Sequence, residues 1–249
     1  MLILQCSWNG CPVTRGSDFS LHNIITATHP QHQHNHNIHN TTTNMAQSTP
    51  NIAGSDAISY IASSIFTYAP SQTVWETLID TSTWPSWNTF CPRVTIRDQP
   101  PTTAPRPGSD QTAPTLSSVL QQGTRMTFHV HMDPASQEEQ DVHLVVTEFQ
   151  PPNATMRKPG RISWGVDPTA SGTLPQFLLR AERVHEVAEV EREEADGTRT
   201  AGTEVRNWEV EAGWVAYAVR WKYGELLQGV FETWVHDLKG YVEGAGSGS

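Results

Sequence analysis

The chain has 249 residues and a formal net charge of −10, which argues against nucleic acid or an anionic membrane surface as its main partner. No run approaches the ~18 consecutive apolar residues of a membrane span, so no integral membrane segment is expected. Three cysteines form no disulfide framework, which favours a reducing compartment, and we therefore expect a cytoplasmic protein.

Composition separates a polar N-terminal extension from a domain that can fold. The first 55 residues are rich in Asn, Thr, His, Ser and Gln and carry only two charged side chains, Arg15 and Asp18. Such a segment buries too little apolar surface to offset the entropy lost on ordering. We therefore expect residues 1–57 to be disordered, residues 58–243 to form one domain and residues 244–249 to form a flexible tail.

The domain begins with a predicted strand that leads into a helical corner. Residues 58–68 are rich in β-branched and aromatic side chains, which favours a strand. A proline then breaks the pattern, and Ser71 is a natural N-cap for a helix over residues 71–79. A second short helix is expected around residues 84–87.

Turn residues divide the middle of the domain into short strands. Residues 99–118 contain five prolines and almost nothing apolar, which predicts a loop insertion. The spacing suits an antiparallel meander rather than parallel βαβ units. The strands are expected at residues 94–97, 123–132, 141–149, 161–166, 176–191 and 203–212.

A long amphipathic helix is expected over residues 217–242. An apolar stripe recurs there at helical spacing, and at a rise of 1.5 Å per residue the helix is long enough to cross a whole sheet. Gly224 and Gly229 interrupt it, which a bend or the close approach of a ligand would explain. The stripe consists of Tyr223, Leu227, Val230, Phe231, Trp234, Leu238 and Tyr241.

Five segments, in this order, resemble the START and polyketide cyclase/dehydrase superfamily. The match as a whole spans about residues 58–243. They are residues 69–80 (Ala-Pro-Ser-Gln-Thr-Val-Trp-Glu-Thr-Leu-Ile-Asp), 84–88 (Trp-Pro-Ser-Trp-Asn), 161–165 (Arg-Ile-Ser-Trp-Gly), 202–213 and 231–239.

The resemblance implies an α+β helix-grip fold. In that fold a curved antiparallel sheet of about seven strands wraps around a long C-terminal helix, with two short helices after the first strand. A cavity for a hydrophobic ligand is implied between sheet and helix, because the superfamily includes lipid carriers, hormone receptors, coenzyme Q-binding proteins and polyketide cyclases. This chain departs from the pattern in its long loop at 99–118 and in Glu211, where the family often has an aromatic residue.

The resemblance also suggests which strand residues face the cavity. If Trp164 points inward like its family counterpart, the alternation of side chains along strands brings several polar groups inside. A buried charge is costly unless it is paired, so they would form an ion-pair network able to orient the polar end of a ligand. The alternative is that they lie at the mouth of the sheet and meet water. These groups are Arg183, His185, Asn207, Glu209 and Glu211.

Two sets of candidate site residues follow. His185 and Glu209 are the catalytic candidates, because a histidine oriented by a carboxylate can act as a general base. The aromatic residues near position 87 either pack in the core or form a lid over the ligand. The expected ligand-binding residues are Trp84, Trp87, Phe90, Trp164, Leu179, Arg183, Val205, Asn207, Glu211, Leu227 and Phe231.

No cofactor or metal is expected. Five histidines lie between residues 29 and 39 and could chelate a metal loosely, but a disordered segment would first have to order itself. His129, His131 and His143 could meet as a zinc site, yet the ordinary alternation of exposed polar residues accounts for them equally well. No phosphate-binding loop, Cys-x-x-Cys or dinucleotide-binding glycine pattern is present.

Three functions remain open at this stage. The leading one is a non-catalytic carrier or binding protein for a small hydrophobic or amphipathic ligand such as a lipid, quinone or polyketide-like molecule. The second is a cyclase or dehydratase that uses His185 with a carboxylate. The third is a protein-interaction module that uses the acidic segment 182–211, which holds ten acidic and four basic residues.

Overall fold

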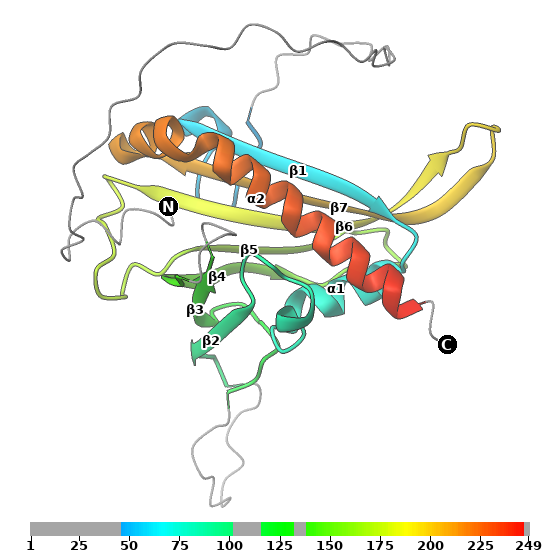
Figure 1. The fold of residues 1–249 in the computed structure, drawn as a ribbon, viewed down its shortest axis with the longest axis horizontal. Helices are drawn as coiled ribbons and strands as arrows, with labels where there is room; N and C mark the ends of the chain where they lie inside the picture. Colours follow the sequence, from blue (N-terminus) through cyan, green and yellow to red (C-terminus); the bar gives the residue numbers. More distant parts are fainter. Residues whose placement is uncertain (1–45, 102–115, 132–137, 247–249) are drawn as a thin grey trace, which may run out of the picture.

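The computed structural model describes residues 46–101, 116–131 and 138–246, which form one curved sheet and a long helix (Figure 1). The seven strands are antiparallel to their neighbours in the order β1-β7-β6-β5-β4-β3-β2. The predicted helix-grip fold is confirmed. The elements are η1 (Gly54–Asp56), β1 (Ser59–Thr67), α1 (Ser71–Ile79), η2 (Trp84–Ser86), β2 (Arg93–Asp98), β3 (Arg125–Val130), β4 (Gln140–Gln150), β5 (Gly160–Val166), β6 (Arg180–Glu193), β7 (Arg199–Ala212) and α2 (Trp214–Gly246).

The main core lies between the sheet and the two α-helices. Figure 1 shows α2 running the length of one face of the sheet, beside β1, with α1 near its C-terminal half. The apolar stripe of α2 is buried there, including Leu227, Phe231 and Trp234. The helix starts three residues earlier than expected because Gly213, at φ +97°, turns the chain directly out of β7.

The corner after β1 differs from the prediction in detail. Ser71 is the first residue of α1 rather than its cap, and its hydroxyl donates to Glu189 on β6. The residue before the helix is Pro70, whose ring fixes φ near the value that leads into a helix. The second expected helix is a single 3-10 turn, η2, in which the indole of Trp84 donates to the carbonyl of Leu78.

Residues 46–57 cover the face of the sheet that is turned away from α2. Asn51 donates from its backbone and its side chain to the buried carboxylate of Glu182, at 2.8 and 2.7 Å. Ile52 packs in a small second core with Trp208 and neighbouring residues of β6 and β7. The prediction of disorder through residue 57 is therefore wrong for residues 46–57, and the rest of that segment lies outside the described residues.

Two other predicted segments are only partly described. Residues 99–101 and 116–118 of the proline-rich loop bracket a stretch outside the described residues, and Gln99 joins the two sides by accepting from the backbone N–H of Ser117. Helix α2 continues to Gly246, so the first residues of the expected flexible tail are helical.

Candidate functional site

The register of β6 and β7 sets two polar pairs side by side on the face toward α2. Arg183 lies opposite Glu209, and His185 lies opposite Asn207. Side chains two residues apart on a strand share a face, and all four are buried in the structure. The inward orientation inferred from strand alternation is therefore what the structure shows.

Arg183 and Glu209 form a buried ion pair. The Arg183 Nε atom donates to Glu209 Oε2 at 2.9 Å, and the guanidinium carbon lies 4.0 Å from the centre of the Phe231 ring. Pairing offsets the cost of burying either charge, and the aromatic face adds a favourable cation–π contact. Both charged residues line a small internal cavity of about 30 Å³, together with Phe90, Phe128 and Trp164.

His185 lies in the centre of the core between two indole rings. Its ring centre is 4.5 Å from that of Trp164 and 5.2 Å from that of Trp234. Burial, reinforced by the charge of Arg183, lowers the pKa of His185 well below its usual value, so the imidazole is neutral near pH 7. Among the described residues, neither ring nitrogen has a hydrogen-bond partner. The expected orienting carboxylate, Glu209, is instead bound to Arg183.

Within the described part of the chain, two buried donors on residues next to His185 also lack partners. They are Asn207 Nδ2 and Trp234 Nε1. The oxygen of the same Asn207 amide lies within hydrogen-bond distance of the Ser63 hydroxyl, whose oxygen is 2.8 Å from the carbonyl of Phe231. Because buried polar groups normally find partners, these three neighbouring residues could stabilise a polar ligand atom or a water, although none of them lines the 30 Å³ cavity.

Sequence reasoning missed Ser63 and Trp234 as members of this site. The position of Ser63 was visible in the alternation of β1, where it falls between Ile61 and Ile65 on the core face. Trp234 had been assigned to the apolar stripe of α2. A hydrophobicity pattern counts an indole as apolar, and it does not register the N–H that the ring carries.

A cluster of aromatic rings fills the space beside the polar groups. Trp84 is fully buried, and its ring packs against four other aromatic residues at centroid distances of 5.0 to 6.3 Å. About 30 Å³ of free volume accommodates only one or two waters. A larger ligand would therefore enter this region only if aromatic side chains moved. The four residues around Trp84 are Trp87, Phe128, Trp164 and Trp234.

All of the residues expected at the site are buried, but they do not form one group. Glu211 lies beside Ser59 and Ala181 at the far end of β7, and burial raises the pKa of its carboxyl group. Leu179 precedes β6 and lies next to the Gly213 turn. The other expected residues line the main core or its polar centre: Trp84, Trp87, Phe90, Trp164, Arg183, His185, Val205, Asn207, Glu209, Leu227 and Phe231.

The histidines on β3 and β4 do not meet as a metal site. His129 Nδ1 lies 2.6 Å from Asp141 Oδ1, and its Nε2 lies 2.8 Å from the Thr95 hydroxyl. His143 pairs with the hydroxyl of Thr127. In the part of the chain that the structure describes, no group of three or more His, Cys, Asp or Glu residues is placed to hold a metal ion.

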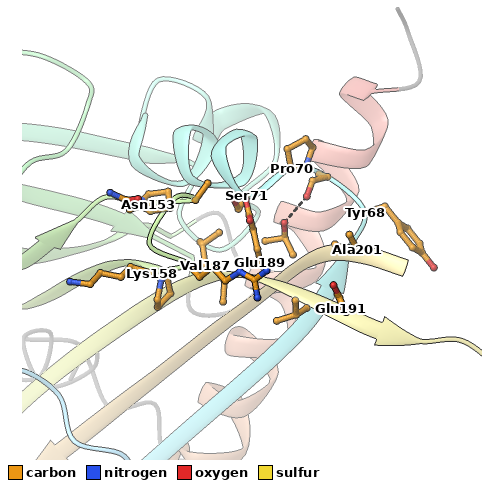
Figure 2. A pocket seen from close by; sticks show the side chains of 18 residues that line it. Tyr68, Pro70, Ser71, Asn153, Lys158, Val187, Glu189, Glu191 and Ala201 are labelled. Carbon is orange, nitrogen blue, oxygen red and sulfur yellow. Dashed lines mark hydrogen bonds between the residues drawn. The ribbon is translucent and has the colours of Figure 1, made fainter. Parts of the chain in front are cut away.

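A second, larger hollow opens at the end of the sheet next to the N-terminus of α1. Its volume is about 700 Å³, and Figure 2 shows Ser71, Asn153, Lys158 and Glu189 around it. Its walls come from the start of α1, the β4–β5 connection and the outer parts of β6 and β7. Sequence reasoning did not find it, because these segments are brought together only by the tertiary fold.

We compared the chain with known families, proteins and solved structures. No family model matches the chain. It is 41% identical, over 199 residues, to the oxopyrrolidines biosynthesis cluster protein O of Penicillium oxalicum, a match that covers 79% of this chain and 93% of that protein. Among solved structures, the hypothetical protein jhp0584 of Helicobacter pylori shares 16% identity at a TM-score of 0.52 and covers 81% of this chain and 98% of its own. A START superfamily protein of Mycobacterium smegmatis shares 11% identity at a TM-score of 0.43, with 75% and 98% covered.

The sheet order and the long C-terminal helix define a helix-grip fold, which the Helicobacter pylori protein shares. The chain belongs to the family of the Penicillium oxalicum cluster protein. Among the described residues, no helix is both long and apolar enough to cross a membrane.

Proposed function

We propose that this protein binds a small amphipathic molecule between the sheet and α2, with the polar end of that molecule at His185, Asn207 and Trp234. The supporting observation is the set of buried polar atoms without partners at this point. A ligand carbonyl could accept from Asn207 Nδ2 or Trp234 Nε1, and a ligand N–H could donate to a nitrogen of His185. The surrounding aromatic rings would cover the apolar part of the molecule.

The chemical class of the ligand is suggested by the relative. That protein is named for an oxopyrrolidines biosynthesis cluster, and an oxopyrrolidine ring carries a carbonyl acceptor that suits the two free donors. We infer that the ligand is an intermediate or product of a similar small-molecule biosynthesis. We also infer that the protein acts in the cytoplasm, where its buried free thiol, Cys91, would stay reduced.

Calorimetric titration with 5-alkyl-2-pyrrolidinones of increasing chain length tests the proposal. Affinity should rise with chain length, because each buried methylene adds about 0.8 kcal/mol. Asn207→Leu should weaken binding about tenfold by removing a buried donor, whereas Lys158→Ala, in the 700 Å³ hollow, should leave binding unchanged. Binding that depends on Lys158 and not on Asn207 would move the site to that hollow.

An enzymatic role is a second candidate, because His185 is a buried imidazole with unpartnered nitrogens, although burial also weakens it as a base. A neutral imidazole with both nitrogens free can accept a proton from a bound substrate, as a cyclase or dehydratase requires. His185→Gln keeps a polar side chain but removes the base. If the protein is an enzyme, this variant should bind substrate and lose turnover at least about a hundredfold. If it is a carrier, the transfer of ligand should continue.

A further inference from the structure

Large aromatic side chains are exposed at the end of the sheet opposite α1. Trp214, Tyr217 and Trp221 on α2 retain 80%, 61% and 87% of their accessible surface, and Phe177 before β6 retains 73%. We call these four residues the aromatic patch. Isolated exposed apolar residues are common, but a group of four, three of them Trp or Tyr, indicates an interaction surface.

The patch occupies one continuous place on the molecule. Positions 214, 217 and 221 are spaced i, i+3 and i+7, so their side chains share one face over the first two turns of α2. The backbone N–H of Val215 donates to the carbonyl of Leu178, which fixes the Phe177 segment against the start of the helix. In Figure 1 this orange end of α2 lies at the far end of the sheet from α1.

The charge around the patch is opposite to that of the chain as a whole. Arg220 and Lys222 are exposed on either side of the aromatic stripe, and residues 214–224 contain no acidic residue. Glu225, the first carboxylate of the helix, is exposed one turn after Trp221 on the same face, so the positive charge is confined to the first two to three turns. A net charge of −10 argues against an anionic surface as a partner for the whole molecule. The first turns of α2 nevertheless carry a local positive charge from Arg220 and Lys222.

We propose that the aromatic patch docks the first two turns of α2 on a membrane surface that contains anionic lipid. Trp and Tyr rings favour the boundary between lipid tails and headgroups, because each combines an apolar ring with a polar atom. Arginine and lysine stems lie along such a boundary with their charged ends toward the headgroups. A two-fold dimer through this face would instead bring the same cations of two copies together. The proposal does not depend on the interior ligand.

Co-sedimentation of the full chain with vesicles tests it. The protein should bind vesicles containing phosphatidylserine more strongly than vesicles of phosphatidylcholine alone. Lys222→Gln should weaken binding roughly fivefold, and Trp214→Ala with Trp221→Ala should weaken it by about tenfold or more. Met156→Ala and Lys158→Gln, an exposed apolar residue and an exposed cation of the β4–β5 connection, are the matched controls and should bind as the wild type does.

Three results would overturn the proposal. One is the absence of vesicle binding by the wild-type chain. Another is equal binding by the double tryptophan variant, provided that its far-ultraviolet circular dichroism and thermal midpoint show a folded protein. The last is self-association of the wild type in sedimentation velocity that the double variant abolishes, which would assign the patch to a second copy of the chain. Pyrrolidinone titration of the same variant keeps this outcome separate from that of the interior site.

Discussion

Burying an arginine and a glutamate together makes each of them depend on the other. Removing the charge of Glu209 by Glu209→Gln should cost about 3–5 kcal/mol of unfolding free energy, because Arg183 then stays buried without a counter-charge. The double variant Arg183→Met with Glu209→Leu should recover most of that loss. Urea unfolding of the three proteins measures the difference.

The same two strands offer a matched control. Arg199 on β7 pairs diagonally with Glu191 on β6, with 3.7 Å between their charged atoms, but both side chains are mostly exposed. Since solvent screens such a pair, Glu191→Gln should change stability by less than about 1 kcal/mol. An equal loss of unfolding free energy at both positions would mean that the buried pair stabilises the fold no more than the exposed pair does.

His185 predicts a pH dependence of stability. Burial lowers the pKa of His185 in the folded state. As the pH falls below the ordinary histidine pKa of 6.5, the unfolded chain therefore binds a proton that the folded chain excludes. Stability should therefore fall as pH falls, by up to about 2 kcal/mol between pH 7 and pH 5 from this residue.

Comparison with His185→Phe isolates that contribution. The variant should lose part of the acid dependence in urea unfolding measured at pH 5, 6 and 7. His236→Ala, at an exposed position on α2, should keep the wild-type slope. Arg183 and Glu211 are present in all three proteins, so their effects cancel in the difference. An unchanged slope in His185→Phe would show that the ring takes up its proton without unfolding.

The direction in which the site residues face could be predicted from the sequence, but the packing between them could not. Alternation places Arg183 with His185 on one face of β6, and Asn207 with Glu209 on one face of β7, and this is local information. That these faces point inward was implied only by the family resemblance. How far the Trp84 cluster fills the interior depends on side-chain shapes from four separate elements. No sequence pattern encodes that volume.

Among the elements, α2 shows most clearly which parts of the structure a local sequence pattern can predict. Its apolar period predicted the helix, whereas residues 214–216 were missed because Trp214 faces outward and does not continue the stripe. Residues 46–57 were missed for a similar reason. Their order depends on contacts with Glu182 and Trp208, which lie more than a hundred residues away.

The glycines of α2 give a prediction at this scale. A Cβ atom added at Gly224 or Gly229 would meet nothing within 4 Å, so the structure shows no close neighbour that requires a glycine. Each change to alanine should therefore raise the free energy of unfolding by up to about 1 kcal/mol. If stability rises while ligand affinity falls, the glycines serve the ligand, as the sequence had suggested.

Gly213 is the contrasting position. Its φ of +97° disfavours any side chain, and an added Cβ atom would lie 2.5 Å from the carbonyl oxygen of Leu178. Gly213→Ala should therefore destabilise the protein by about 1–3 kcal/mol. Thermal unfolding of the three alanine variants side by side would contradict this account if all of them shifted in the same direction.

For the molecule as a whole, residues 46–57 pack against the face of the sheet turned away from α2 and stabilise it. Asn51→Ala should cost about 1–3 kcal/mol, because the buried carboxylate of Glu182 loses a donor. Gln47→Ala, on the exposed part of the same segment, should cost much less. Chemical unfolding compares them, and similar losses would argue that the segment contributes no specific contact.

The unbroken pairing of β6 with β7, from Arg180↔Ala212 to Glu193↔Arg199, also constrains how this family can change over generations. One residue inserted between Arg183 and His185 would reverse the facing of all that follows on β6, and it would separate the charged pair from the histidine. Length differences between descendants of this gene are therefore expected at the hairpin tip, residues 194–198, and not along the paired ladder. Natural variation there would leave the interior chemistry untouched.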